Sequence, residues 1–532
     1  MAIMEQDRER ALAGPREWAA LVVLLLPVLL ISIDMTVLSF AVPHLSADLA
    51  PSGTELLWIV DVYGFMIAGL LVTAGTLGDR IGRRKLLLAG ATAFGVASVL
   101  AAYSTSPEML IVARALLGVA GATLMPSTLS LIRNIFHDVR QRTLAIAIWA
   151  TMFSAGAALG PVVGGWLLEH FWWGSVFLVA LPVLALLLIF APLVVPESKD
   201  PAPGPYDLPS AGLSLVAMLA AVYGIKGLAT GSLSVLYVAA LVAGVLVGVA
   251  FVRRQRRLET PLLDLGLFAR PAFRASVVTN LLTTFAMIGA LFFMTQYLQL
   301  VLGMEPLESG LVLVPGLVLA ILTGLVAVPL MRRLPTPWLL FGALLVVAAG
   351  FGLMVLAGRG LGAGLVIAAF VLVGAGVGLV QTITNNIIMS TVDPARAGAA
   401  AAVSETAYEV GGGLGTAVLG SVLTAVYASS LVAVPGVDGP ALESARETLG
   451  GAVDVAGSLP SSASAALLAA ADDAFTRAVE VTSVIGALVV VGAAVQALVV
   501  LRRGGPSLAE SSVDPSDESA AESAVQSSLG GH

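Results

Sequence analysis

Four carboxylic acids lie inside long apolar segments of this 532-residue chain. Asp34 is the single charged residue of Leu24–Pro43, a stretch long enough to cross the hydrocarbon core of a bilayer as a helix. An ionised side chain at that depth costs about 2.5–3.5 kcal/mol on insertion scales, so it needs a wet cavity, a charged partner or a proton. Asp61, Glu405 and Glu409 lie in apolar segments of the same kind.

Asp34 could exchange a proton for a positively charged guest. A carboxyl group away from water favours its protonated form, whereas a neighbouring cation favours the ionised form. A proton and a cationic guest would therefore compete for this side chain. Arg114, inside another apolar segment, would repel such a guest and is expected to be the charge partner of Asp34. The alternative is that the two residues form a permanent, structural pair.

Glu405 and Glu409 are four residues apart, with Tyr408 beside them, so both acids lie on one face of a helix. Two close acids favour holding a shared proton. The alternative is a polar contact that closes the inner gate.

Trp58, Asp61 and Phe65 are spaced i, i+3 and i+7 and also share one helix face. An acid between aromatic rings suits a lipophilic cation, through charge pairing and a cation–π contact. Two alternatives remain: Asp61 solvates an outer vestibule, and Trp58 is an aromatic residue at the membrane interface.

The composition predicts an integral membrane protein: 58% of the residues are hydrophobic and 11% are charged, against about 25% charged residues in soluble domains. The basic clusters are short and flank apolar segments, so no nucleic-acid partner is expected. The absence of cysteine excludes disulfides and Cys-ligated zinc, and we predict no metal site. The preference for Arg over Lys suggests a bacterial source.

Apolar segments recur about every 30 residues and predict about fourteen membrane-spanning helices. The expected spans are 19–41, 56–77, 86–103, 108–131, 143–166, 174–195, 209–228, 234–252, 275–299, 308–331, 337–357, 363–388, 398–427 and 482–501. An even number places both termini on one side of the membrane.

The distribution of Lys and Arg indicates which side this is. Of the 27 such residues, 22 lie at the N-terminus, after the last span or in alternate loops. The other loops are expected to hold four, which are Lys226, Arg359, Arg446 and Arg477, and Arg114 lies inside a span. By the positive-inside rule both termini are cytoplasmic. The helix rise then places Asp34, Asp61 and Arg114 in the outer half of the membrane, with Glu405 and Glu409 nearer its inner side.

Two long segments lie outside the spans. Residues 428–481 are external and rich in Ala, Ser and Gly, and they form either a solvated tether or a lid over the outer mouth. Residues 502–532 are acidic and Ser-rich, which predicts a disordered cytoplasmic tail.

A glycine-rich basic loop joins the second and third spans, and alone it could be a membrane anchor loop. Its pattern resembles the signature loop of the major facilitator superfamily. The matching residues are Gly75, Gly78, Asp79, Arg80, Gly82, Arg83 and Arg84. Around Asp34 the chain is similar to the first-span motif of the fourteen-span drug:proton antiporters of that superfamily, and Arg114–Gly118 resembles its intramembrane arginine motif. The fifth span contains a motif similar to that of exporters: Gly156, Gly160, Pro161, Gly164 and Gly165.

The resemblance implies a major facilitator fold, with two six-helix bundles around a central cavity and two inserted helices. The corresponding units are an N-terminal segment 1–18, a first bundle 19–195, inserted helices 196–274, a second bundle 275–501 and the tail 502–532. The glycine motif is expected to seal and rock the two bundles, and the basic loop to act as an inner latch.

The function that the resemblance implies is export of lipophilic cationic drugs across a bacterial plasma membrane in exchange for protons. Such a protein is not an enzyme, needs no cofactor beyond the proton gradient, and is expected to be a monomer in the lipid bilayer. The alternatives are a dedicated pump for one neutral or anionic antibiotic, an importer, a membrane enzyme, and a structural or signalling membrane protein.

Overall fold

Fourteen helices in the described part of the chain are long and apolar enough to cross a membrane. The computed structural model describes residues 12–199, 207–229, 234–259, 261–357, 362–392 and 397–503. The predicted all-α membrane fold and the number of spans are therefore confirmed. Residues 1–11 and most of the predicted disordered tail, from residue 504 on, lie outside the described residues.

The helices fall into three groups along the chain. The N-terminal half comprises α2 (Pro15–Leu49), α3 (Gly53–Ile81), α4 (Arg83–Ala102), α5 (Pro107–Ile135), α6 (Val139–His170), α7 (Ser175–Leu178) and α8 (Ala180–Val194). The inserted hairpin comprises α9 (Leu208–Ala229) and α10 (Val235–Gln255). The C-terminal half comprises η1 (Leu265–Ala269), α11 (Pro271–Gln296), η2 (Tyr297–Val301), α12 (Pro306–Met331), α13 (Thr336–Ala357), α14 (Gly362–Ser390), α15 (Ala397–Ser430), α16 (Gly439–Glu447), α17 (Leu449–Gly457) and α18 (Ser461–Arg503).

Local sequence signals explain several helix boundaries. Ser52 and Glu55 form a capping box at the start of α3: the Ser52 hydroxyl accepts from the Glu55 amide at 3.3 Å, and the Glu55 carboxylate accepts from the Ser52 amide at 2.9 Å. Gly82 turns the chain between α3 and α4 with a φ of 113°, which a residue with a Cβ rarely adopts. The capping box begins α3 and the turn at Gly82 ends it, so that α2, α3 and α4 are separate spans.

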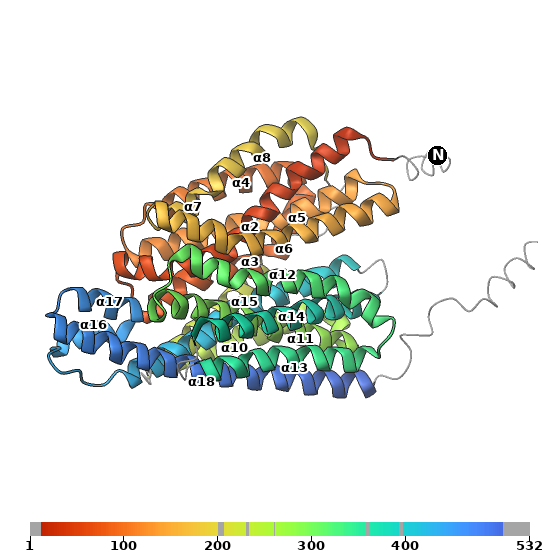
Figure 1. The fold of residues 1–532 in the computed structure, drawn as a ribbon. Helices are drawn as coiled ribbons and strands as arrows, with labels where there is room; N and C mark the ends of the chain where they lie inside the picture. The colour runs from red at the N-terminus through yellow and green to blue at the C-terminus, as the bar shows by residue number, and fades with distance from the viewer. Residues whose placement is uncertain are drawn as a thin grey trace, which may run out of the picture.

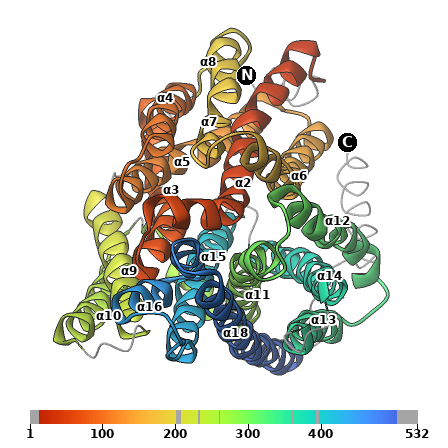
Figure 2. The same cartoon turned by 60° about the vertical axis from the view of Figure 1, so that its left-hand side comes forward.

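The two halves lie one above the other, and the inserted hairpin lies beside them (Figures 1 and 2). The helix α9 packs against α10, against α3 of the N-terminal half and against α15 of the C-terminal half. It therefore covers the seam between α3 and α15. The residue boundaries of the three units remain a prediction.

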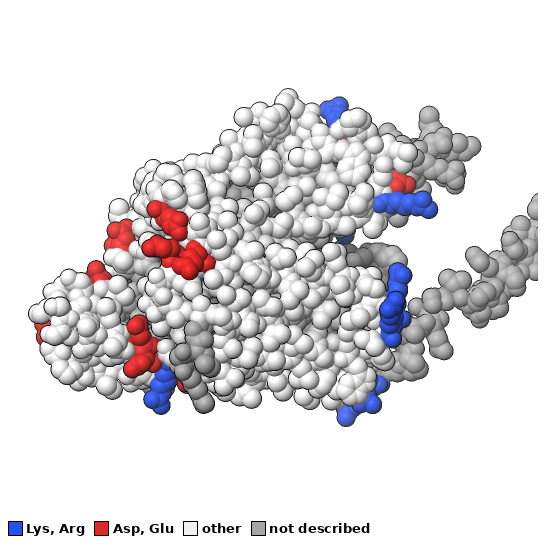
Figure 3. Space-filling view, viewed as in Figure 1, with Lys and Arg blue, Asp and Glu red and all other residues white. Residues whose placement is uncertain are grey.

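The halves meet at one end of the bundle and diverge toward the other, where α2 begins (Figure 1). Lys and Arg gather mainly at this diverging end, here called the basic end, and Asp and Glu mainly at the opposite, acidic end (Figure 3). At the acidic end the Leu307 amide donates to Glu169 across the seam at 3.2 Å, and the Gln299 amide donates to the Phe40 carbonyl at 3.2 Å. Polar contacts thus hold the halves together at the acidic end.

The segment 428–481 is folded, which excludes the solvated tether. It contains α16, α17 and the first part of α18, a 43-residue helix that begins well before the predicted span. Across the seam, Glu447 accepts from the Gly53 amide at 3.3 Å, and a Cβ on Gly450 would lie 2.7 Å from Ser46. The segment therefore covers the acidic end of α2 and α3 as a lid.

Candidate functional site

Asp34 and Arg114 form a buried ion pair between α2 and α5. The Arg114 Nη1 donates to Asp34 Oδ2 at 2.8 Å, and the exposed fraction is 2% for Arg114 and 6% for Asp34. The low dielectric around such a pair strengthens the attraction between the two opposite charges. Removal of either partner would leave the other as an uncompensated buried charge. The carboxylate therefore faces Arg114 directly, and a cationic guest at Asp34 would have to compete with this guanidinium group.

Arg114 also ties α5 to α3. Its Nε donates to the carbonyl of Ile59 at 3.1 Å, and its Nη2 donates to the carbonyl of Val60 at 3.4 Å. The guanidinium carbon lies 4.5 Å from the centre of the Tyr63 ring and 5.9 Å from that of Phe177. Because one side chain contacts three helices, a change in its charge balance would be felt across the N-terminal half.

A small cavity lies between the two halves. Its volume of about 10 Å³ is room for about one water molecule. The lining includes five large, adaptable side chains: Met35, Phe153, Met287, Phe370 and Tyr408. Met and aromatic side chains accommodate apolar guests of different shapes, and the aromatic faces attract cations. The acids Asp34 and Glu409 do not line this cavity, although each is next in the chain to a lining residue, Met35 and Tyr408 respectively.

Glu409 is the least satisfied of the four acids. Its exposed fraction is 1%, and neither carboxylate oxygen has a hydrogen-bond partner among the described residues. A Cβ on Gly64 of α3 would lie 3.7 Å from Glu409 Oε2, so the carboxyl group approaches the N-terminal half. An unpaired carboxylate in such a place is costly, which favours a bound proton or a cationic partner.

Glu405 and Tyr408 complete this face of α15. Both are partly exposed, and Glu405 lies within electrostatic range of Glu409. Tyr408 lines the cavity and meets Phe153 of the N-terminal half edge-on, with ring centres 5.8 Å apart. Glu405, Tyr408 and Glu409 thus share one region of α15, and of the three only Tyr408 lines the cavity.

Asp61 is placed differently from our expectation. Its Oδ1 accepts from the Nζ of Lys226 at 2.8 Å, and Nζ also lies 4.0 Å from the centre of the Trp58 ring. The acid and aromatic pair predicted to bind a lipophilic cation is therefore filled by the protein's own ammonium group. Phe65, on the same face, packs in a cluster with α9 and α15 residues rather than along the cavity.

The prediction that Lys226 lies in an external loop is wrong. Lys226 is part of α9, and 1% of it is exposed. The signal was present, because residue 226 falls inside the predicted span 209–228 and near its outer end. Asp61 had been placed near the outer end of its own span, at a similar depth.

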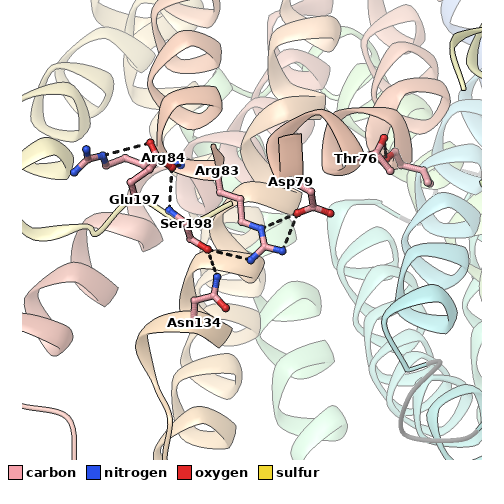
Figure 4. Close-up of polar contacts among 8 residues, drawn as sticks. Thr76, Asp79, Arg83, Arg84, Asn134, Glu197 and Ser198 are labelled. Carbon is pink, nitrogen blue, oxygen red and sulfur yellow. Dashed lines mark hydrogen bonds and ion pairs between the residues drawn. The ribbon is translucent and has the colours of Figure 1, made fainter. Parts of the chain in front are cut away.

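The basic loop between α3 and α4 is joined to the segment after α8 (Figure 4). Arg83 donates to Asp79 Oδ1 at 2.8 Å through Nε, and its backbone amide donates to the Ser198 carbonyl at 2.8 Å. The Arg84 amide donates to Glu197 Oε1 at 3.0 Å. These contacts all lie within the N-terminal half. These contacts stabilise the turn between α3 and α4 in this conformation, and the role of the loop as an inner latch stays a prediction.

The other residues of this loop act mainly through the backbone. A Cβ at Gly82 would lie 2.7 Å from Glu197, and one at Gly78 would lie 3.2 Å from Leu86. At Gly75 an added Cβ would make only ordinary contact with Pro126, at 3.7 Å. Arg80 lies at the end of α3 and also interacts.

The glycine motif of α6 has two faces rather than one. Cβ atoms at Gly156, Gly160 and Gly164 would lie within 3 Å of α2 atoms, so these glycines pack inside the N-terminal half. Only Gly165 and Pro161 meet the C-terminal half: a Cβ on Gly165 would lie 2.4 Å from the Cα of Leu307. The expectation that the whole motif seals the two bundles is corrected, because the stripe at every fourth residue faces α2.

Gly160→Ala is expected to lower the stability of the protein by about 1–3 kcal/mol, because the added methyl group overpacks the contact between α6 and α2. The methyl carbon would lie 1.9 Å from Thr36 Oγ1 and 3.2 Å from the carbonyl oxygen of Ile33. Thermal unfolding of the purified variant in detergent measures the effect. The control is Gly342→Ala in α13, where no heavy atom lies within 4 Å of the new Cβ. Equal melting temperatures for the two variants would contradict the prediction.

Carboxyl groups such as those of Asp34 and Glu409 have the chemistry to bind a proton or a cation. Within the described ranges, no three His, Asp or Glu side chains gather into a possible metal site. The N-terminal half holds a buried acid that is paired, Asp34, and the C-terminal half holds a buried acid, Glu409, that has no partner among the described residues.

Comparison with known proteins places these features in a family. The family model of the Major Facilitator Superfamily matches residues 24–416. The multidrug efflux pump LfrA of Mycolicibacterium smegmatis is 50% identical over 488 residues, covering 92% of this chain and 97% of that protein. The methyl viologen resistance protein SmvA of Salmonella typhimurium is 35% identical over 86% of this chain and 93% of that protein.

Two further comparisons extend the range. The tetracenomycin C resistance and export protein of Streptomyces glaucescens is 34% identical over 90% of this chain and 91% of that protein. Among solved structures, a bacterial homologue of the lysosomal transporter Spinster, in an inward-facing and unoccupied conformation, superposes with a TM-score of 0.64 at 17% identity. That superposition covers 92% of this chain and 99% of the other.

Proposed function

Because the chain belongs to the Major Facilitator Superfamily of membrane transporters, we propose that it exports lipophilic cationic drugs in exchange for protons. The observation that carries the proposal is Glu409, a buried acid whose two oxygens have no partner among the described residues and which follows Tyr408, a residue of the Met- and aromatic-lined cavity. A carboxyl group in this state is stabilised either by a proton or by a cation, and not by both at once. Because the two exclude each other, movement of the proton in one direction is coupled to movement of the drug cation in the other.

The relatives support the drug class. One is named as a multidrug efflux pump, and another for resistance to methyl viologen, which is an organic dication. The aromatic rings of Phe153 and Tyr408, on opposite halves, lie edge to face at the cavity, where an apolar cation would insert between them. The cavity has room for about one water molecule in this conformation, so a drug binds only after the halves separate further.

In the proposed cycle, a cation enters from the basic end, where the halves diverge, and displaces a proton from Glu409. The halves then rock so that the acidic end opens. Protons from that side displace the cation and neutralise the acids, which permits the return. The Asp34–Arg114 pair links the proton state of α2 to α3 and α5 through the Arg114 contacts.

The proposal has consequences for location and energy source. Drug export against a gradient needs the proton gradient of a bacterial plasma membrane and no bound cofactor. Lys and Arg gather mainly at the basic end, which by the positive-inside rule supports a cytoplasmic position for this end and for both termini. We propose a monomer as the working unit, because the cavity lies between the two halves of one chain.

The test is drug-induced proton release from the purified protein in detergent, measured with a pH dye in weak buffer. Ethidium and tetraphenylphosphonium are expected to release protons in a saturable way, whereas neutral analogues of similar size are not. In inverted vesicles, ethidium uptake is expected to stop when a protonophore collapses the gradient. Ethidium transport that continues unchanged under a protonophore would overturn proton coupling.

The second candidate is a dedicated pump for one neutral or anionic antibiotic. The similarity to the tetracenomycin C resistance and export protein favours it. The same release experiment separates the two functions: a response to a single uncharged compound and to no cation supports the dedicated pump.

A further inference from the structure

The inserted hairpin contributes one buried charge to the rest of the protein. Lys226 lies in the last turn of α9, and its Nζ donates to Asp61 Oδ1 of α3 at 2.8 Å. The exposed fractions of the two side chains are 0% and 1%. Replacement of a buried ion pair by apolar residues often leaves the stability of a protein unchanged or raises it. The presence of a buried lysine and aspartate here therefore calls for an explanation other than stability.

The surroundings of the ammonium group have the chemistry of a cation site. An ammonium ion has three N–H donors; one is satisfied by Asp61, and the group also lies 4.0 Å from the centre of the Trp58 ring. Tyr223, one turn before Lys226, lies with its ring centre 6.5 Å from that of Trp58. The second carboxylate oxygen, Asp61 Oδ2, is buried and has no partner among the described residues.

The site lies away from the drug cavity. The face of α3 that carries Trp58, Asp61 and Phe65 packs against α9 and α15, in a cluster that includes Val222 and Ala417. The cavity is lined instead by residues of α2, α6, α11, α12, α14 and α15. A ligand at Trp58 and Asp61 therefore sits under the inserted hairpin, at the seam between the two halves.

We propose that Trp58 and Asp61 form a binding site for a primary ammonium ion, that Lys226 occupies it as a tethered ligand, and that this contact fastens the inserted hairpin to the N-terminal half. Another polar contact between α9 and α3 is the hydrogen bond that the Ser214 hydroxyl donates to the Gly69 carbonyl at 3.4 Å. The ion pair is shorter and is charged, so it is the stronger of the two attachments.

The occupied site is closed to exported cations. A drug would have to displace an ammonium group that the chain itself holds at high effective concentration. Asp61 is thus reserved for the protein's own cation, and the proposed drug site depends on Glu409 instead.

Chemical rescue tests the proposal directly. Lys226→Ala removes three methylene groups and the ammonium group, so n-propylammonium matches what is lost. The full-length variant, purified in detergent, is expected to melt at a lower temperature than the parent. Millimolar n-propylammonium chloride is expected to restore about half of the loss or more in a saturable way. Sodium chloride at the same ionic strength is the control and is expected to restore none of it.

One further variant decides between the outcomes. Lys226→Ala combined with Asp61→Asn lacks the carboxylate and is expected not to respond to n-propylammonium. The proposal is overturned if this double variant responds as strongly as Lys226→Ala, or if neither responds. The readout is thermal stability, so the result does not depend on whether the protein exports cationic drugs.

A double-mutant cycle covers the case in which Lys226→Ala does not fold. Lys226→Met combined with Asp61→Asn replaces the ion pair by uncharged groups of similar size and is expected to melt above either single variant. Additive losses of melting temperature in this cycle would show that the two residues do not interact, which overturns the proposal.

Discussion

Arg114→Met is expected to abolish drug export and to destabilise the protein by about 3–5 kcal/mol, because it leaves the Asp34 carboxylate buried without its partner. The two groups are 2.8 Å apart, and almost none of either is exposed. The variant also loses the hydrogen bonds to the Ile59 and Val60 carbonyls. Thermal unfolding in detergent and ethidium efflux from whole cells measure the two effects.

The combined variant Asp34→Asn and Arg114→Met tests whether the ion pair contributes only to stability or is also needed for transport. Both charges are gone, so most of the stability is expected to return. Export is expected to remain absent, because no group at this position can change its charge. A double variant that exports ethidium like the parent would show that the pair is only structural. Arg503→Met, at the exposed end of α18, controls for loss of a positive charge and is expected to behave like the parent.

Glu409→Gln is expected to remove most of the drug-induced proton release. The amide has nearly the shape of the protonated acid, so the fold should be preserved, but it can neither release a proton nor pair with a cation. We expect the affinity for tetraphenylphosphonium to fall about tenfold or more, which corresponds to about 1.4 kcal/mol or more. Isothermal titration in two buffers with different ionisation enthalpies reports the affinity and the released protons together.

Glu405→Gln is the matched control for this variant. Glu405 lies one turn away on the same helix face, but part of it is exposed, so its charge is partly solvated. Its replacement is expected to weaken binding less and to leave proton release in place. Equal losses for the two variants would indicate that the acids act as one coupled pair, and normal release from Glu409→Gln would exclude this acid as the exchange site.

Local patterns were sufficient to predict the spans and the acids inside them. A helix needs about twenty apolar residues to cross a bilayer, so each span is a property of one segment and can be found without knowledge of its neighbours. The fourteen spans of the structure correspond to the predicted fourteen. For the same reason, a carboxylate such as Asp34 or Glu409 in an apolar segment is visible in the sequence as a functional candidate.

The helix face of a residue was also predictable, but not the partner of that face. Trp58, Asp61 and Phe65 do share a face, yet this face meets α9 and α15 and not the cavity. Gly156, Gly160 and Gly164 do form one stripe, yet it packs against α2 within one half. The periodicity of a helix is local, whereas the choice of neighbour depends on how all fourteen spans pack.

The amino-acid sequence was therefore sufficient to predict an all-α membrane protein with fourteen spans, and to identify the acids that lie inside these spans. The tertiary structure alone decided which acids are paired: Arg114 neutralises Asp34, Lys226 neutralises Asp61, and Glu409 has no partner among the described residues. The physical reason is distance. The energy of a buried charge depends on the groups within a few ångströms, and here those groups come from segments that are 80 and 165 residues away in the chain.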